Sequence, residues 1–147
     1  MSPSNTNYNT NYWLLVEDDE DDQNIFKIAY KTAGIENTLI VMNNGEEALE
    51  YIKKTKESPF VIISDINMPK MNGLELLREM KDDKMSQFKS IPYLIISSST
   101  SETEIVAAYK FGAQGYFGKT MSMIDQVDLI LNIKKYWAKC RHPSYFT

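Results

Sequence analysis

The sequence predicts an α/β fold in which a doubly wound parallel sheet of five strands carries helices on both faces. Two observations support this prediction. Five short apolar runs are spaced along the chain, and each is continuous rather than alternating, which is typical of strands buried on both faces. Segments with apolar residues at helical spacing separate these runs, so strand and helix alternate along the chain. The length of 147 residues suits one such domain.

The N-terminal part of the chain contains the first three strands and two helices. We expect the strands at residues 12–16, 38–42 and 60–63. The first helix, at residues 22–33, has acids in its first turn, where the helix dipole favours negative charge, and it stops at Gly34. Its inward positions are predicted to be Ile25, Ile28, Ala29 and Thr32. The second helix begins at Asn44 and carries Ala48, Tyr51 and Ile52.

The C-terminal part contains three more helices and two strands. A helix over residues 73–80, with Leu74, Leu77 and Met80 inward, precedes a strand at residues 93–96. The segment Ser101-Glu102-Thr103-Glu104 is a capping box for a helix that runs to about Phe111 and ends at Gly112. A short strand at residues 115–118 follows. The last helix spans residues 122–137, and its inward positions are predicted to be Ile124, Val127, Ile130 and Leu131.

Composition excludes several classes of protein. The chain has 16 Lys and Arg residues against 20 Asp and Glu residues, and this acidic balance disfavours a nucleic-acid binder, which needs a basic face. A single cysteine, Cys140, and a single histidine, His142, exclude an intrachain disulfide, a cysteine-clustered metal site and a histidine-rich metal centre. No apolar run approaches the roughly 20 residues of a membrane span, and residues 1–11 do not resemble a signal peptide, so we expect a cytoplasmic protein.

Polar residues follow the predicted strands at the points where these strands end. Glu17 and Asp18 follow the first strand, and Asp65 follows the third. Ser97 follows the fourth strand and Lys119 the fifth. Ligands of an open parallel sheet bind at this carboxyl edge. Three carboxylates converging there repel one another unless a cation lies between them, and oxygen-only ligands favour Mg²⁺ before Ca²⁺ or Mn²⁺.

The surrounding residues narrow the chemistry further. We interpret Glu20, Asp21 and Asp22 as a solvated helix N-terminus. No Gly-x-Gly-x-x-Gly follows the first strand and no P-loop motif is present, which disfavours both kinds of nucleotide site. A flavodoxin would offer hydroxyls and amides where this chain offers acids. Carboxylates, a magnesium ion, the Ser97 hydroxyl and the Lys119 ammonium together suit phosphoryl transfer, with Asp65 as the nucleophile.

These residues resemble the receiver domain of two-component response regulators, over about residues 13–137. The resemblance rests on Leu-Leu-Val-Glu-Asp-Asp at 14–19, Ile-Ile-Ser-Asp-Ile-Asn-Met-Pro-Lys-Met-Asn-Gly at 62–73, Ile-Ile-Ser at 95–97 and Gly-Ala-Gln-Gly-Tyr-Phe-Gly-Lys at 112–119. It implies a flavodoxin-like sheet with the strand order 2-1-3-4-5. It also implies that Asp65 is the phosphoacceptor and that Lys119 is the family's lysine. The implied metal ligands are Asp18, Asp65, the backbone carbonyl of Asn67, and Glu17 acting through water.

The resemblance also implies a switch. Ser97 senses the phosphoryl group, and Tyr116 is the aromatic residue that turns inward once Ser97 moves. Asn67 and Ser99 occupy positions that tune autodephosphorylation, while Pro69 and Gly73 shape the loop after Asp65.

Two positions depart from the family pattern. Thr120 stands where proline usually follows the lysine, often through a cis bond, and a cis bond to another residue costs about 2.5–4 kcal/mol. We therefore expect a trans bond and a differently shaped loop. Ser98 stands where the family has Ala or Gly, and it is expected to narrow access to Asp65.

The resulting hypothesis is a stand-alone, chemotaxis-type receiver in a two-component phosphorelay. We expect residues 1–11 to form a disordered polar tail, residues 12–138 the receiver domain, and residues 139–147 a C-terminal tail that includes His142, with no effector domain. The expected partners are a sensor histidine kinase or histidine phosphotransfer protein, and a downstream protein bound by the fourth helix, fifth strand and fifth helix. Neither nucleic-acid binding nor membrane insertion is expected.

Two alternatives remain open. One is a pseudo-receiver that binds partners without phosphorylation, which only Thr120 supports. The other is a magnesium-dependent aspartyl phosphatase, which would need a general acid two residues after Asp65, where this chain has Asn67. On the leading hypothesis the chain is not an enzyme and catalyses only its own phosphorylation and dephosphorylation.

Overall fold

The computed structural model describes residues 11–55, 57–82, 84 and 88–142, and within them strands and helices alternate as expected. The strands are β1 (Trp13–Val16), β2 (Leu39–Met42), β3 (Val61–Ser64), β4 (Tyr93–Ser97) and β5 (Gly115–Gly118). They form one parallel sheet in the order β2-β1-β3-β4-β5. The helices are α2 (Glu20–Thr32), α3 (Gly45–Lys54), α4 (Gly73–Lys81), α5 (Glu102–Lys110) and α6 (Met123–Lys139). The predicted α/β fold and its strand order are confirmed.

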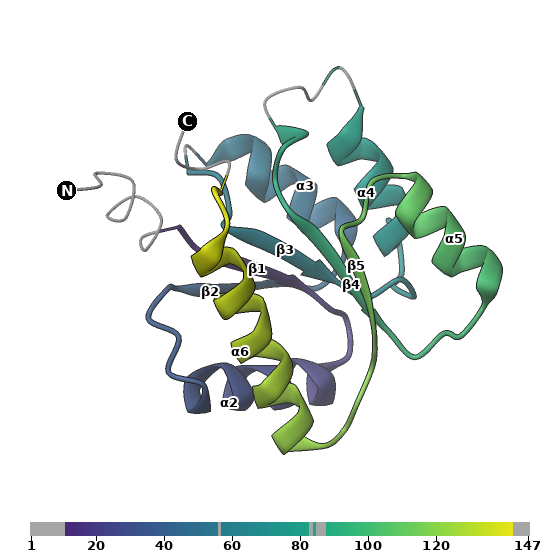
Figure 1. The fold of residues 1–147 in the computed structure, drawn as a ribbon. Coiled ribbons are helices and arrows are strands. Elements are labelled where there is room, and N and C mark those ends of the chain that lie inside the picture. Colours follow the sequence, from purple (N-terminus) through teal and green to yellow (C-terminus); the bar gives the residue numbers. More distant parts are fainter. Residues whose placement is uncertain (1–10, 56, 83, 85–87, 143–147) are drawn as a thin grey trace.

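The sheet separates two apolar cores (Figure 1). Helices α2 and α6 cover one face, and α3, α4 and α5 cover the other. Successive side chains of a strand point to opposite faces, so Leu14 packs with the α3–α5 side while Trp13 and Leu15 pack with the α2–α6 side. The central strands β1, β3 and β4 are buried throughout, whereas the edge strands β2 and β5 are only partly buried. The expectation that every strand is buried on both faces is therefore wrong for the two edges.

Two helix faces differ from the prediction. Ile28 of α2 is 55% exposed, and Ile124 of α6 is 80% exposed. The buried stripe of α6 contains Gln126, Ile130, Ile133 and Trp137. At about 100° per residue, Gln126 lies about 40° from Ile130 around the helix axis and Ile124 about 120° away, so a polar side chain faces the sheet and the isoleucine faces solvent.

The C-terminal part of the described chain packs further than predicted. Helix α6 ends at Lys139, and His142, assigned to the tail, is 1% exposed. Its ring stacks on Phe60 with centroids 4.3 Å apart, and its Nε2 lies 2.6 Å from the Phe60 carbonyl oxygen. At the other end Asn11 donates to the Ser58 carbonyl at 3.2 Å. The rest of both predicted tails, residues 1–10 and 143–147, lies outside the described residues. No helix in the described part of the chain is long and apolar enough to cross a bilayer.

Candidate functional site

The carboxyl edge of the sheet gathers the polar residues that follow the strands. Val16 of β1 pairs with Ser64 of β3, so Glu17 and Asp65, the next residues along, emerge side by side. Ser97 is the last residue of β4 and pairs with Gly118 of β5, directly before Lys119. Parallel register therefore brings four positions from distant parts of the sequence to one edge.

Three carboxylates form a cluster at this edge. One oxygen from each of Glu17, Asp18 and Asp65 lies within 4.8 Å of the others. Glu17 and Asp65 are 4% and 8% exposed, whereas Asp18 is exposed, so the cluster has one open side. The donor set consists of oxygens alone, which fits a hard cation such as Mg²⁺ that keeps part of its water shell. The chemistry of these residues therefore fits the expected metal.

Lys119 lies against the buried side of the cluster. Its Nζ is 2.8 Å from Asp65 Oδ2, 2.8 Å from Glu17 Oε1 and 2.7 Å from Asp22 Oδ2. An ammonium has three N–H donors, and these three carboxylates use them all. Burial alone would lower the pKa of Lys119, but the hydrogen bonds to the carboxylates outweigh it, so its pKa is raised and the side chain is fully charged.

The electrostatic balance at Glu17 is different. Burial raises the pKa of the Glu17 carboxyl, and the hydrogen bonds from Lys119 and the Asp19 backbone N–H only partly offset this. Asp65 raises it further through like-charge repulsion. The charged form of Glu17 is therefore costly in the absence of a cation, which is the condition that favours metal binding at this edge.

Asp22 is a site residue that our sequence analysis missed. We interpreted it as part of a solvated helix N-terminus, an interpretation that fits the exposed residues Glu20 and Asp21 but is wrong for Asp22. Helix α2 begins at Glu20 with Asp19 as its N-cap, and this start turns Asp22 toward Lys119. Asp19 is a residue type that caps helices, and this is the signal that could have placed Asp22 in the first helical turn.

Two buried glutamines bind backbone carbonyl groups at or next to site residues, and the sequence analysis predicted neither. Gln23 Nε2 donates to the Glu17 carbonyl oxygen at 2.5 Å and to Asn43 Oδ1 at 2.8 Å. Gln126 Nε2 donates to the Thr120 carbonyl oxygen at 2.9 Å. This hydrogen bond connects the loop that carries Lys119 to helix α6.

Gln126 also helps to hold the loop at Thr120, the position where the family usually has proline. The bond between Lys119 and Thr120 is trans, as expected, since the described residues contain no cis peptide bond. Lys119 N donates to the Ser97 carbonyl oxygen at 2.9 Å, and Ser122 N donates to Thr120 Oγ1 at 3.1 Å. With Gln126, these bonds hold the loop where proline would otherwise restrict it, and Lys119 still reaches Asp65.

The predicted switch residues lie around the loop after β4. Ser97 is 1% exposed, and its Oγ accepts from Ser99 N at 3.1 Å. The Tyr116 hydroxyl donates to the Ser99 carbonyl oxygen at 2.9 Å, and the half-buried tyrosine packs against the α3–α5 core. Asn67 and Ser98 are exposed. Tyr116 is therefore already bonded to this loop in the structure.

A close approach behind Asp65 requires Gly73. A Cβ at this position would lie 2.0 Å from the Asp65 carbonyl oxygen and 2.7 Å from Ser64 Oγ. Gly73 N donates to the Ile66 carbonyl oxygen at 3.0 Å, which closes the loop containing Pro69. The N-terminus of α4 is thereby packed directly on the backbone of the acceptor residue.

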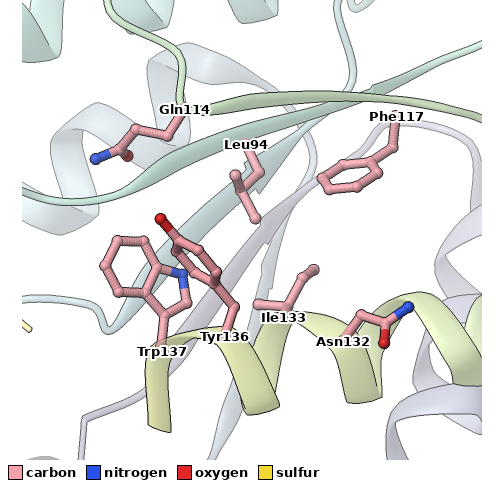
Figure 2. A pocket seen from close by; sticks show the side chains of 7 residues that line it. All are labelled: Leu94, Gln114, Phe117, Asn132, Ile133, Tyr136 and Trp137. Atoms are coloured by element: carbon pink, nitrogen blue, oxygen red, sulfur yellow. The ribbon is translucent and has the colours of Figure 1, made fainter. Parts of the chain in front are cut away.

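A larger cavity lies elsewhere and does not belong to this site. It has a volume of about 380 Å³ between α6 and the strands β4 and β5 (Figure 2). Leu94, Phe117, Ile133, Tyr136 and Trp137 form its apolar walls, with the amides of Gln114 and Asn132 at its margins. No carboxylate or ammonium lines it, so the chemistry described above belongs to the carboxyl edge.

Comparisons with known proteins agree with this fold. A family model described as the response regulator receiver domain matches residues 13–131. The response regulator Rcp1 of Synechocystis sp. is 29% identical over 129 residues, which cover 84% of this chain and 86% of that protein. Chemotaxis protein CheY1 of Helicobacter pylori (strain ATCC 700392 / 26695) is 34% identical over 106 residues, 72% of this chain and 82% of that one.

Solved structures give the same result. The phosphorylated cyanobacterial phytochrome response regulator RcpA has a TM-score of 0.81 to this structure at 25% identity, covering 91% of this chain and 99% of that one. A family model that spans most of the chain, relatives of similar length and a solved structure therefore agree with the observed fold. The chain belongs to the response regulator receiver domain family of two-component signalling.

Proposed function

We propose that this receiver accepts a phosphoryl group on Asp65 and uses it to switch a protein-binding face. The observation that carries the proposal is the convergence of Glu17, Asp18 and Asp65 within 4.8 Å, with the Lys119 ammonium 2.8 Å from Asp65 Oδ2. Asp65 Oδ1 accepts from Ile66 N at 2.7 Å, which fixes the carboxylate plane. A positioned carboxylate beside cationic groups is what an aspartyl phosphate needs.

The donor is a phosphohistidine on a sensor kinase or a histidine phosphotransfer protein. A carboxylate oxygen of Asp65 attacks phosphorus, the bond from phosphorus to the imidazole nitrogen breaks, and the imidazole leaves with the electron pair. The product is an acyl phosphate on Asp65 and a free histidine on the donor. Lys119 donates to an oxygen of the transferred group, and the Ser97 hydroxyl binds another.

Mg²⁺ would be held by Asp18, Asp65 and the backbone carbonyl of Asn67, with Glu17 acting through a water molecule. It would supply positive charge to the phosphoryl oxygens. Hydrolysis of the acyl phosphate returns inorganic phosphate and the free Asp65 carboxylate. In the family, the residues two positions beyond the acceptor and beyond the sensing hydroxyl tune this step, and in this chain these residues are Asn67 and Ser99.

The output face comprises α5, β5 and α6, the fourth helix, fifth strand and fifth helix of the sequence prediction. Tyr116 of β5 bonds to Ser99 in the loop before α5, so a change at Ser97 reaches this face through two contacts. Val106 and Tyr109 of α5 are 56% and 51% exposed, and apolar side chains of this kind suit contact with a protein partner.

Turnover of a phosphate ester is disfavoured. The residue two beyond Asp65 is Asn67, whose amide cannot protonate a leaving group. The position of Lys119 also weakens the case for a pseudo-receiver, because Thr120 leaves its ammonium in contact with Asp65.

Intact-mass spectrometry after incubation with acetyl phosphate and Mg²⁺ tests the proposal. The wild type should gain one phosphoryl group, EDTA should prevent the gain, and Asp65→Asn should show none while retaining its fold by circular dichroism. A wild type without an adduct is then titrated with beryllofluoride, a stable phosphoryl mimic. Absence of both the adduct and beryllofluoride binding would refute the proposal, whereas binding alone would indicate a short-lived acyl phosphate.

A further inference from the structure

Lys119 is held through its backbone as well as through its ammonium. On the N-terminal side, Lys119 N donates to the Ser97 carbonyl oxygen of β4 at 2.9 Å. On the C-terminal side, the Thr120 carbonyl oxygen accepts from Gln126 Nε2 of α6 at 2.9 Å. Thr120 Oγ1 also accepts from Ser122 N at 3.1 Å, directly before α6 begins. The backbone around the lysine is therefore tied to the sheet on one side and to a helix on the other.

Gln126 is the polar member of the buried stripe of α6. It is only 6% exposed, and Ile130, the next residue on the same face, is fully buried. Gln126 Oε1 is buried and has no hydrogen-bond partner among the described residues. Buried polar atoms are normally paired, so packing alone favours an apolar side chain at this position. The bond from Nε2 to the Thr120 carbonyl oxygen is the one polar contact that the Gln126 side chain makes within the described part of the chain.

Gln126 and Lys119 line the same small cavity. Its volume is about 20 Å³, and Asp22 and Glu17 also contribute to its wall. This volume is close to that of one water molecule, so little room separates α6 from the lysine. The Lys119 side chain is itself only 16% exposed. An enclosed side chain cannot compensate freely for a displaced backbone, so the path of the loop determines where the ammonium lies.

We propose that Gln126 is a positioning residue for phosphoryl transfer. Its amide holds the loop backbone so that the Lys119 ammonium points toward the oxygens of a phosphoryl group on Asp65. The inference rests on the proposed function of Asp65. Three carboxylates contact the ammonium in the structure, and a phosphoryl group must take over at least one of its three N–H donors. The bond from Gln126 does not involve these carboxylates, so it holds the lysine backbone whichever partners the ammonium has.

Beryllofluoride titration in saturating Mg²⁺ tests the inference with Gln126→Met. Methionine is unbranched and of similar length but cannot donate to the Thr120 carbonyl oxygen. We expect beryllofluoride to bind about tenfold more weakly, the low end for loss of a hydrogen bond to a charged group. Mg²⁺ affinity, measured separately, should not fall, because the carboxylates of the cluster remain. The urea midpoint should change little, because the substitution also removes the unpaired Oε1.

Two further variants separate a positioning role from a general effect. Gln114→Met makes the same substitution directly before β5, where Gln114 Oε1 accepts from Tyr93 N at 2.8 Å. It should lower the urea midpoint but leave beryllofluoride affinity within about twofold of wild type, because Gln114 is not part of the acidic edge. In Lys119→Met the ammonium is absent, so adding Gln126→Met should change beryllofluoride affinity by less than about twofold.

Wild-type affinity for beryllofluoride in Gln126→Met would overturn the inference. An equal loss in Gln114→Met would overturn it too, as would a further loss of about tenfold when Gln126→Met is added to Lys119→Met. Parallel losses of Mg²⁺ affinity and of the urea midpoint in Gln126→Met would show a structural role only, against the inference. A wild type that neither binds beryllofluoride nor gains a phosphoryl group from acetyl phosphate would refute the proposed function, and the inference with it.

Discussion

Replacing Lys119 by methionine tests how the acidic edge is held together. The substitution keeps an unbranched side chain but removes the only ammonium in contact with Glu17, Asp22 and Asp65 among the described residues. The Glu17 and Asp65 side chains are 6% and 9% exposed, so water cannot replace the lost partner well. Removing one member of a buried ion pair typically costs about 3–5 kcal/mol. Asp22 is more exposed, so we expect the lower end, a loss of about 3 kcal/mol in unfolding free energy at neutral pH in EDTA.

Magnesium should reverse most of this loss. A ligand that binds only the folded state adds about 2.7 kcal/mol when its concentration is a hundred times its Kd. The variant lacks the ammonium that would compete with a metal for these carboxylate oxygens, so it should bind Mg²⁺ more tightly than the wild type and gain more stability from it. Urea denaturation of both proteins, in EDTA and in saturating Mg²⁺, measures the two differences.

The control is Lys54→Met, which removes an ion pair with Glu50 whose side chains are 76% and 63% exposed. That variant should change little in either condition, because surface pairs contribute little. Equal stability of Lys119→Met and the wild type in EDTA would refute the reasoning. A stability gap that widened when Mg²⁺ was added would refute it too.

Two further predictions concern packing around the site and at the C-terminal end. Gly73→Ala should displace the Asp65 backbone, lower stability by about 1–3 kcal/mol and slow phosphorylation by acetyl phosphate, whereas Gly118→Ala, with no atom within 4 Å of the new Cβ, should do neither. Burial lowers the pKa of His142 below 6.5, despite the hydrogen bond to the Phe60 carbonyl, so the unfolded chain gains a proton that the folded chain does not. Stability should therefore fall as the pH drops below about 6.5, and His142→Phe, which keeps a stacking ring, should show a flatter dependence in urea midpoints. If the pH dependence of the urea midpoint were unchanged in His142→Phe, groups other than His142 would cause the acid sensitivity.

The strands and the polar edge could be predicted because they depend on local pattern and on topology. A continuous apolar run such as residues 13–16 favours a central strand of a sheet that helices cover on both faces. Once the strands are parallel, the residues that follow them must meet at one edge, which places Glu17, Asp65 and Lys119 together without knowledge of any side-chain contact.

The missed residues depend on how helices are rotated against the sheet. Asp22 reaches Lys119 because α2 begins at Glu20, two residues earlier than predicted, and Asp22 lies in its first turn. Gln126 is buried and Ile124 exposed because Ile130 and Trp137 determine which side of α6 faces the sheet. His142 is buried because Phe60, 82 residues away in sequence, offers a ring and a carbonyl oxygen.

The contacts of Lys119 bear on how the proposed transfer proceeds. Its three N–H donors are all used by carboxylates, yet a phosphoryl group on Asp65 needs at least one of them. Glu17 and Asp65 belong to the cluster that suits a cation, and Asp22 does not. If a cation took over the charge of Glu17 and Asp65, two donors of Lys119 would become available and the bond to Asp22 would remain. Under the proposed function, Asp22 would then keep the ammonium beside Asp65 during the exchange of partners, which gives a role to a carboxylate that contacts Lys119 from outside the metal cluster.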